Sequence, residues 1–153
     1  MNAEKYTQKA LDAVKTAQSM AQENGNQYVT SEHLLYALLD QDGGLIGSLF
    51  GKMGVDCDGL LSELDTLIRK LPRISGGSGE VYASPEVGKI FNLAEKTAEK
   101  LHDEYLSVEH LMLAIFSERS QSVRQLLSDH GITRSRFSDE LAKVKTSPVT
   151  SDN

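Results

Sequence analysis

Two Glu-His pairs are the residues whose types and spacing come nearest to a chemical site. Glu32-His33 and Glu109-His110 stand 77 positions apart in similar local sequences. Glutamate and histidine serve as general acids and bases and as zinc ligands. A zinc-peptidase helix, however, needs H-E-x-x-H, so that two imidazoles share one helical face. Here the order is reversed and no second histidine follows at i+4. We therefore expect no metal site and no catalytic residues at either pair.

A nucleotide site is not predicted either. Gly51-Lys52 superficially resembles a phosphate-binding loop, which requires G-x-x-x-x-G-K-[ST] so that its amides and hydroxyl hold phosphate and magnesium. Ile46 stands where the first glycine is needed, and Met53 replaces the hydroxyl residue. No Ser-His-Asp or Cys-His arrangement can be argued from the spacing of the remaining candidates. We expect a non-catalytic binding domain that carries no cofactor.

The composition indicates an ordinary globular protein of 153 residues, with 39% apolar and 25% charged residues. Its net charge of −6 lacks the basic stripe that nucleic-acid binding needs. The single cysteine, Cys57, excludes an internal disulfide and fits a reducing compartment. No apolar run approaches the roughly 18 residues of a membrane span, and the first residues lack a signal peptide's apolar stretch. We expect a cytoplasmic protein that binds neither nucleic acid nor membranes.

An internal repeat organises the chain and places the Glu-His pairs. A shift of 77 positions superposes some sixty residues without a gap, and "TSEHLLYALLD" from Thr30 falls on "SVEHLMLAIFS" from Ser107. Apolar residues at helical spacing predict four helices in each copy, and no useful period-2 run predicts a strand. A unit of about 60 residues buries little surface alone, so two copies should share a core. We predict an all-α fold, with two pseudo-symmetric four-helix repeats packed into one eight-helix domain.

The repeat sets the expected boundaries. The first four-helix repeat should span residues 1–72 and the second 84–145. Between them, residues 73–83 contain a Gly/Ser-rich run that is typical of a flexible connector. Residues 146–153 look like the start of an interdomain linker.

The Glu-His pairs have a structural explanation in this scheme. With Thr30 and Ser107 as N-caps, each glutamate is the second and each histidine the third helical residue. A hydroxyl cap and an acidic first turn both stabilise a helix, and a polar third residue can reach back to the cap's amide. The glutamates should also lie near the solvent-facing ends of the bundle. An exposed carboxylate beside an apolar groove would be a plausible anchor for a peptide.

The repeated pattern [T/S]-x-E-H-[L/I]-[L/M] after a long first helix resembles the N-terminal domain of the Clp chaperones, over residues 1–146. "LDQDGG" at 39–44 and "LPRISGGSGEV" at 71–81 look most like the ClpB, or disaggregase, branch. The resemblance implies a mobile substrate-capture domain of a hexameric ring ATPase that works with the DnaK system. ATP and magnesium would bind only in ATPase domains outside this chain. The partners would be unfolded or aggregated polypeptides, and the isolated domain would be a monomer.

The family's substrate-binding surface also carries over to individual residues. Its polar positions match Thr7, Asp103 and Glu109, and its apolar groove matches Leu93. At Thr97 and His110 the family often has leucine. The groove of this chain would therefore be shallower or more polar than is usual in the family. Taken alone, Thr7 would be an exposed residue in the first turns of a helix, and Asp103 a loop residue.

An alternative resemblance is to the ClpC branch, whose N-terminal domain docks adaptors or binds phosphoarginine. Each glutamate of the repeated pattern, Glu32 and Glu109, would then grip a guanidinium group with help from a hydroxyl such as Thr7. Lys89 would be a candidate partner for the phosphate. Two equivalent sites are the distinguishing expectation of this alternative.

Overall fold

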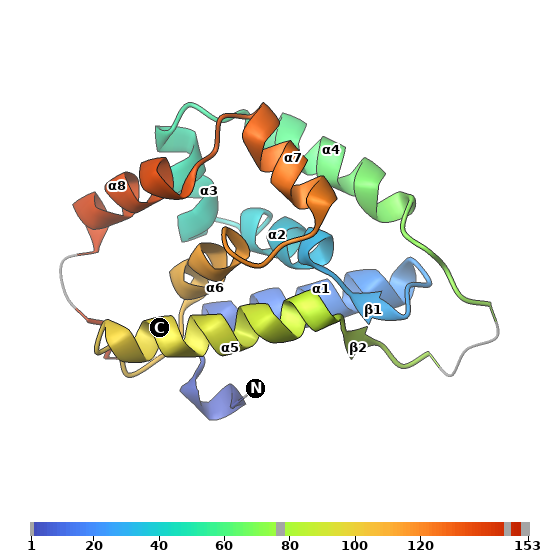
Figure 1. Ribbon diagram of the computed structural model, residues 1–153, viewed down its shortest axis with the longest axis horizontal. Helices are drawn as coiled ribbons and strands as arrows, with labels where there is room; N and C mark the ends of the chain where they lie inside the picture. Colours follow the sequence, from blue (N-terminus) through green and yellow to red (C-terminus); the bar gives the residue numbers. More distant parts are fainter. Residues whose placement is uncertain (1, 76–78, 146–147, 151–153) are drawn as a thin grey trace.

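The computed structural model describes residues 2–75, 79–145 and 148–150, and over this part of the chain it is built almost entirely of helices (Figure 1). A 3-10 turn, η1 (Ala3–Lys5), precedes the first long helix. The first half then contains α1 (Gln8–Glu23), β1 (Tyr28–Val29), α2 (Ser31–Leu39), α3 (Leu45–Lys52) and α4 (Cys57–Arg69). The second half contains β2 (Tyr82–Ala83), α5 (Pro85–Lys100), α6 (Val108–Ile115), α7 (Gln121–Asp129) and α8 (Arg134–Val144).

The helices obey the predicted repeat. The starts of α1 and α5, of α2 and α6, and of α4 and α8 are each separated by 77 positions, and those of α3 and α7 by 76. The predicted all-α fold of two four-helix repeats in one domain is therefore confirmed. The Gly/Ser-rich run at 76–78 and the tail residues 146–147 and 151–153 lie outside the described residues.

Most helices begin at a hydroxyl or carboxylate cap. Asp56 and Thr133 accept a hydrogen bond from the third residue of α4 and α8. Ser84 caps α5 with Pro85 as its first residue, a position where proline loses no hydrogen bond. Thr7 caps α1, and its side chain accepts from the N–H of Ala10 at 3.2 Å. Thr7 is 1% exposed, so the expectation of an exposed residue inside the helix is wrong.

Short main-chain pairings tie each repeat to the other. The N–H of Ser84 and of Tyr82 donate to the carbonyls of Val29 and Gln27, both at 3.0 Å, which forms the parallel pair β1–β2. Thr7 N–H donates in the same way to Leu106 O at 2.9 Å. The segment before the first helix of one repeat thus pairs with the loop after the first helix of the other, in both directions.

The two repeats share one apolar core. In Figure 1, α2 and α6 lie at the centre, with α1 and α5 below and α3, α4, α7 and α8 above. Nearly every side chain of α2 and α6 is buried, while α1 and α5 bury one stripe each. Phe137 of α8 packs against Phe50 of α3, with ring centroids 6.1 Å apart, and against Phe116 at 5.7 Å. Aromatic contacts therefore join the last helix of the second repeat to the first repeat.

We expect Phe137→Ala to lower the free energy of unfolding by about 3–5 kcal/mol, because it removes a fully buried ring between the repeats. Urea unfolding followed by ellipticity measures the change. Leu101→Ala, at a side chain that is 46% exposed, is the control and should change stability by less than about 0.5 kcal/mol. Equal losses for the two variants would contradict the shared core.

Candidate functional site

A buried histidine fixes the start of α2. The backbone N–H of Thr30 donates to Nδ1 of His33 at 2.9 Å, which completes a capping box. Because Nδ1 accepts this hydrogen bond, Nε2 carries the proton and donates to Asn26 Oδ1 at 2.9 Å. Asn26 in turn donates to the carbonyl of Pro72 at 3.0 Å. One neutral imidazole thereby joins the helix start to the preceding loop and to the segment after α4.

The second repeat builds the same arrangement around a charged partner. Ser107 N–H donates to Nδ1 of His110 at 2.9 Å, and Nε2 of His110 donates to Asp103 Oδ2 at 2.6 Å. Asp103 occupies the repeat position of Asn26. A carboxylate has acceptors only, so every further partner of Asp103 must be a donor.

Asp103 finds these donors at the C-terminal end of the chain. Lys145 Nζ lies 2.5 Å from Asp103 Oδ2 and 3.6 Å from Glu109 Oε2. The backbone N–H of Val149 donates to Asp103 Oδ1 at 2.6 Å. Burial alone would raise the pKa of Asp103, but the hydrogen bonds from Lys145, Val149 and His110 outweigh it and hold the pKa below its usual value. Asp103 is therefore a buried carboxylate in its ionised form.

The two histidines stay neutral near pH 7. Burial lowers the pKa of His33 to about 4. Burial also lowers the pKa of His110, although the negative charges of Glu109 and Asp103 oppose that shift. Both imidazoles are fully buried. Protonation would add a donor at Nδ1, where the cap's amide already donates.

The structure brings together three of the predicted site residues. Asp103, Glu109 and His110 form one cluster, in which the Ser107 hydroxyl also donates to Glu109. Glu109 is only 5% exposed, so the expectation of an exposed carboxylate at this glutamate is wrong, and Asp103 is buried as well, at 8%. His110 is fully buried and hydrogen-bonded to Asp103, so it forms no part of a groove wall.

The other two predicted residues lie at the margin of this cluster. Thr7 is joined to it through the hydrogen bond from its N–H to Leu106 O. Leu93 is half-buried on α5 and packs against the core. Thr97 adds less polarity beside it than the sequence suggests, because its hydroxyl donates to the carbonyl of Leu93 at 2.9 Å.

A hollow of about 470 Å³ opens beside Asp103. Carboxylate side chains dominate its polar rim, and Lys5 is the basic residue in its wall. Its lining residues are Asn2, Lys5, Glu95, Ala98, Glu99, Asp103, Glu104 and Leu106. Such a rim favours a ligand with positive charge and disfavours an acidic one.

Glu32 has different surroundings from Glu109. The Ser120 hydroxyl, at the start of α7, donates to Glu32 Oε1 at 2.7 Å, and the Ser31 hydroxyl lies 3.2 Å from the same oxygen. Glu32 is 4% exposed. Lys89 is exposed on α5. The two glutamates of the repeated pattern are thus not equivalent, since Glu109 faces a lysine in addition to the Ser107 hydroxyl, whereas Glu32 faces the hydroxyls of Ser31 and Ser120.

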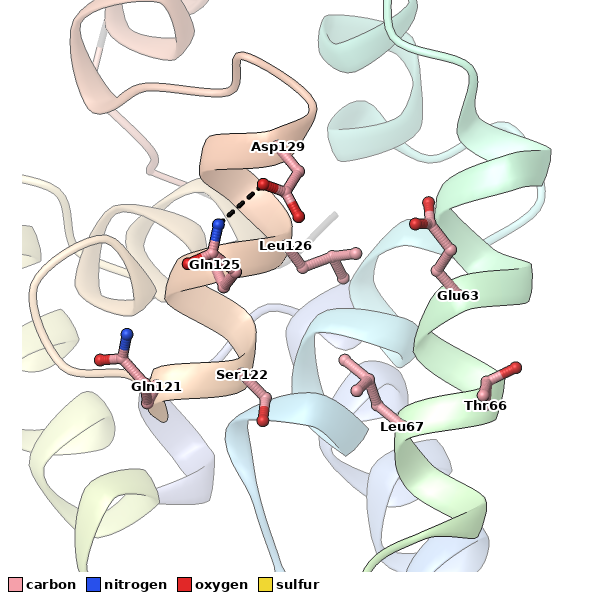
Figure 2. A pocket seen from close by; sticks show the side chains of 8 residues that line it. All are labelled: Glu63, Thr66, Leu67, Gln121, Ser122, Gln125, Leu126 and Asp129. Carbon is pink, nitrogen blue, oxygen red and sulfur yellow. Dashed lines mark hydrogen bonds between the residues drawn. The ribbon is translucent and has the colours of Figure 1, made fainter.

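A second hollow, of about 510 Å³, separates α4 from α7 (Figure 2). Leu67 and Leu126 point into it from opposite helices, and Glu63 and Asp129 lie toward one end. Gln125 donates to Asp129 at 2.7 Å, and His130 pairs with Glu63 at the surface. None of the site residues predicted from the sequence lines this hollow.

Sequence reasoning missed Lys145 and Val149, which supply the cation and the main-chain donor to Asp103. The repeat itself carried a signal for one of them, because Lys145 falls at the position of the apolar Ile68. Over residues 2–75, 79–145 and 148–150, no cluster of three metal-ligating side chains is present. No helix in the same ranges is long and apolar enough to cross a membrane.

Residues 5–130 match the family model of the Clp repeat (R) N-terminal domain. The chaperone protein ClpB of Brucella suis is 36% identical over 99% of this chain, which spans 18% of that protein's length. The Hsp104 N-terminal domain of Candida albicans superposes with a TM-score of 0.86 at 17% identity, covering 97% of each chain. A ClpV N-domain in complex with a VipB peptide superposes with a TM-score of 0.71 at 20% identity, covering 91% of this chain and 86% of that one.

We expect stability to fall as the pH drops from about 6.5 to about 4, because unfolding lets His33 take up a proton that the folded state excludes. The loss at pH 4.5 relative to pH 7 should be on the order of 2 kcal/mol for His33. His33→Gln keeps a side chain that suits a capping box and removes this titration.

Urea unfolding of both proteins at pH 7 and pH 4.5 measures the difference. The depressed pKa of Asp103 affects stability only below about pH 4, where its unfolded form begins to protonate. An equal loss in His33→Gln and the parent chain would show that His33 is not the group responsible.

Proposed function

The chain belongs to the Clp repeat (R) N-terminal domain family, and from this premise we propose that it is the substrate-binding domain of a ClpB-like disaggregase. In this role it captures unfolded or aggregated polypeptide and hands it to a ring ATPase for threading. The domain itself carries no catalytic residues or cofactor. ATP and magnesium act in ATPase domains outside this chain.

One observation carries the proposal. At the second repeat, two carboxylates hold the Lys145 ammonium, and the adjoining loop hydrogen-bonds the main chain of Val149. A basic side chain and a main-chain amide are features that most unfolded segments offer without a fixed sequence. The acidic rim beside the cluster supports the same preference, since it repels acidic segments.

The proteins similar to this chain support a polypeptide as the ligand. The ClpV N-domain, which has the same fold, holds a peptide. The similarity to ClpB supports a larger assembly in which this domain is one part of a homohexamer that cooperates with the DnaK system in the cytoplasm. The isolated domain would be a monomer in this proposal.

The alternative is a ClpC-like domain that docks adaptors or binds phosphoarginine. Its supporting observation is Glu109, whose carboxylate already lies 3.6 Å from a cationic nitrogen and would accept a guanidinium group. The surroundings of Glu32 argue against it, because Ser120 and Ser31 occupy the carboxylate there. Thr7 is also engaged as a helix cap. We therefore favour polypeptide capture.

We expect Glu109→Gln to weaken binding of an unfolded protein such as casein by about 3- to 10-fold, because it removes one of two charges that attract a basic side chain. Heteronuclear NMR titration of the labelled chain measures the affinity and locates the shifts. The matched control is Glu63→Gln, at the rim of the other hollow, which should leave the affinity unchanged. Casein that shifts no resonance near Leu93 and Glu109 would contradict the proposal.

Calorimetry with free phosphoarginine tests the alternative. We expect no pair of equivalent binding events, because Glu32 and Glu109 differ in their partners. Glu32→Gln and Glu109→Gln serve as matched variants. Two sites of equal affinity, each abolished by one of these substitutions, would favour the ClpC-like function instead.

A further inference from the structure

Lys145 and Val149, which follow α8, lie on the proposed binding site itself. We define the clasp as Lys145 together with residues 148–150, and the second-repeat edge as Asp103, Glu104 and Glu109. Glu104 N–H donates to Val149 O at 2.7 Å, and Val149 N–H donates to Asp103 Oδ1 at 2.6 Å. Both main-chain groups of Val149 are thus bound by the edge, the carbonyl by a main-chain N–H and the N–H by a side-chain carboxylate.

We infer that the second-repeat edge is a binding site for an extended main chain that carries a basic side chain, and that the clasp is its resident, displaceable occupant. The inference rests on the proposed function in one respect only, namely that unfolded polypeptide is the ligand that displaces the clasp. The clasp then keeps the site filled until a substrate segment replaces it.

The first repeat has a different occupant at the corresponding position. Pro72, 77 positions before Val149, accepts a hydrogen bond from Asn26 at 3.0 Å, and Ile74 N–H donates to Gly25 O at 2.9 Å. The segment that contains Pro72 and Ile74 is tied down on both sides, because α4 precedes it and the β1–β2 pair follows it. Its counterpart in the second repeat follows α8, and residues 148–150 form no helix or strand.

The contacts of Asn26 and of Asp103 with these two segments also differ in charge. Asn26 binds Pro72 through a neutral amide, whereas Asp103 binds the clasp through a buried charge. A buried carboxylate that loses its cation is strongly destabilised, so the edge cannot simply be vacated. It has to exchange the Lys145 ammonium for another cation. A substrate segment with a lysine or arginine beside an extended main chain supplies both the cation and the donor.

The hollow beside Asp103 gives such a segment a path to the edge. Asp103 and Glu104 line this hollow and also bind the clasp. The side chain of Lys145 is 19% exposed, whereas the side chain of Asp103 is fully buried. The cation is therefore reachable from solvent, while the carboxylate beneath it is covered by its occupant.

The test compares two variants of the whole chain. Val149→Pro removes the N–H that donates to Asp103, and Val149→Ala keeps it and is the matched control. Amide hydrogen exchange of Glu104 reports docking of the clasp, because this N–H donates to Val149 O. We expect faster exchange in Val149→Pro than in Val149→Ala. Equal exchange in the two variants would show that the clasp is not docked and would overturn the inference.

Binding is then measured by NMR with two probes, a synthetic peptide with the sequence of residues 143–150 and casein. Both should bind Val149→Pro about 3- to 10-fold more tightly than Val149→Ala, because one resident hydrogen bond no longer competes. A peptide that does not shift Glu104 or Glu109 in Val149→Pro would show that the edge is no binding site.

The two probes separate this inference from the proposed function. Casein that binds both variants equally would overturn displacement of the clasp and leave polypeptide capture intact. Peptide that binds the edge more tightly in Val149→Pro while casein binds neither variant would support the edge as a site and overturn capture of unfolded protein.

Discussion

The buried histidine at the start of α2 and of α6 is the interaction on which the rest of the domain depends. Each imidazole accepts a hydrogen bond from its N-cap amide and donates to the residue seven positions earlier, Asn26 or Asp103. The loop between these two points is therefore fixed in shape. That loop is also the one whose carbonyls receive the N-terminal segment of the other repeat. A neutral imidazole thus sets the geometry through which two small helical units become one domain.

Duplication explains the shared framework, and divergence at two positions explains why the repeats differ in chemistry. Asn26 of the first repeat corresponds to Asp103 of the second, and Ile68 corresponds to Lys145. The histidine accommodates either partner, since its Nε2 proton can be donated to an amide oxygen or to a carboxylate. The charged version requires a cation, and the chain provides one from the end of α8. The neutral version needs only a carbonyl, which Pro72 supplies.

Much of this framework was predictable from the sequence because it is local. Thr30, Ser107, Ser84 and Asp56 each stand directly before the first residue of a helix, and short-range capping decides such helix starts. The 77-residue repeat then set the fold class. The pairing of Thr7 with Leu106 was not predictable in this way, since it joins residues far apart in the chain through main-chain atoms that carry no sequence signal. The burial of Glu109 was missed for a related reason, because Lys145 and the Ser107 hydroxyl that satisfy it became visible only in three dimensions.

The contrast between the repeats also explains why only one of them suits a ligand that must be released. A contact made of neutral hydrogen bonds, as at Asn26, has no charged group to exchange. A buried carboxylate pair with a partly exposed lysine has one, because any cation with an adjoining main-chain donor satisfies the same charge. Desolvating the incoming cation offsets much of its attraction to the carboxylates, which keeps the exchange close to balanced. Weak, sequence-tolerant binding then follows from the electrostatics of Asp103 and Glu109 rather than from a poorly formed site.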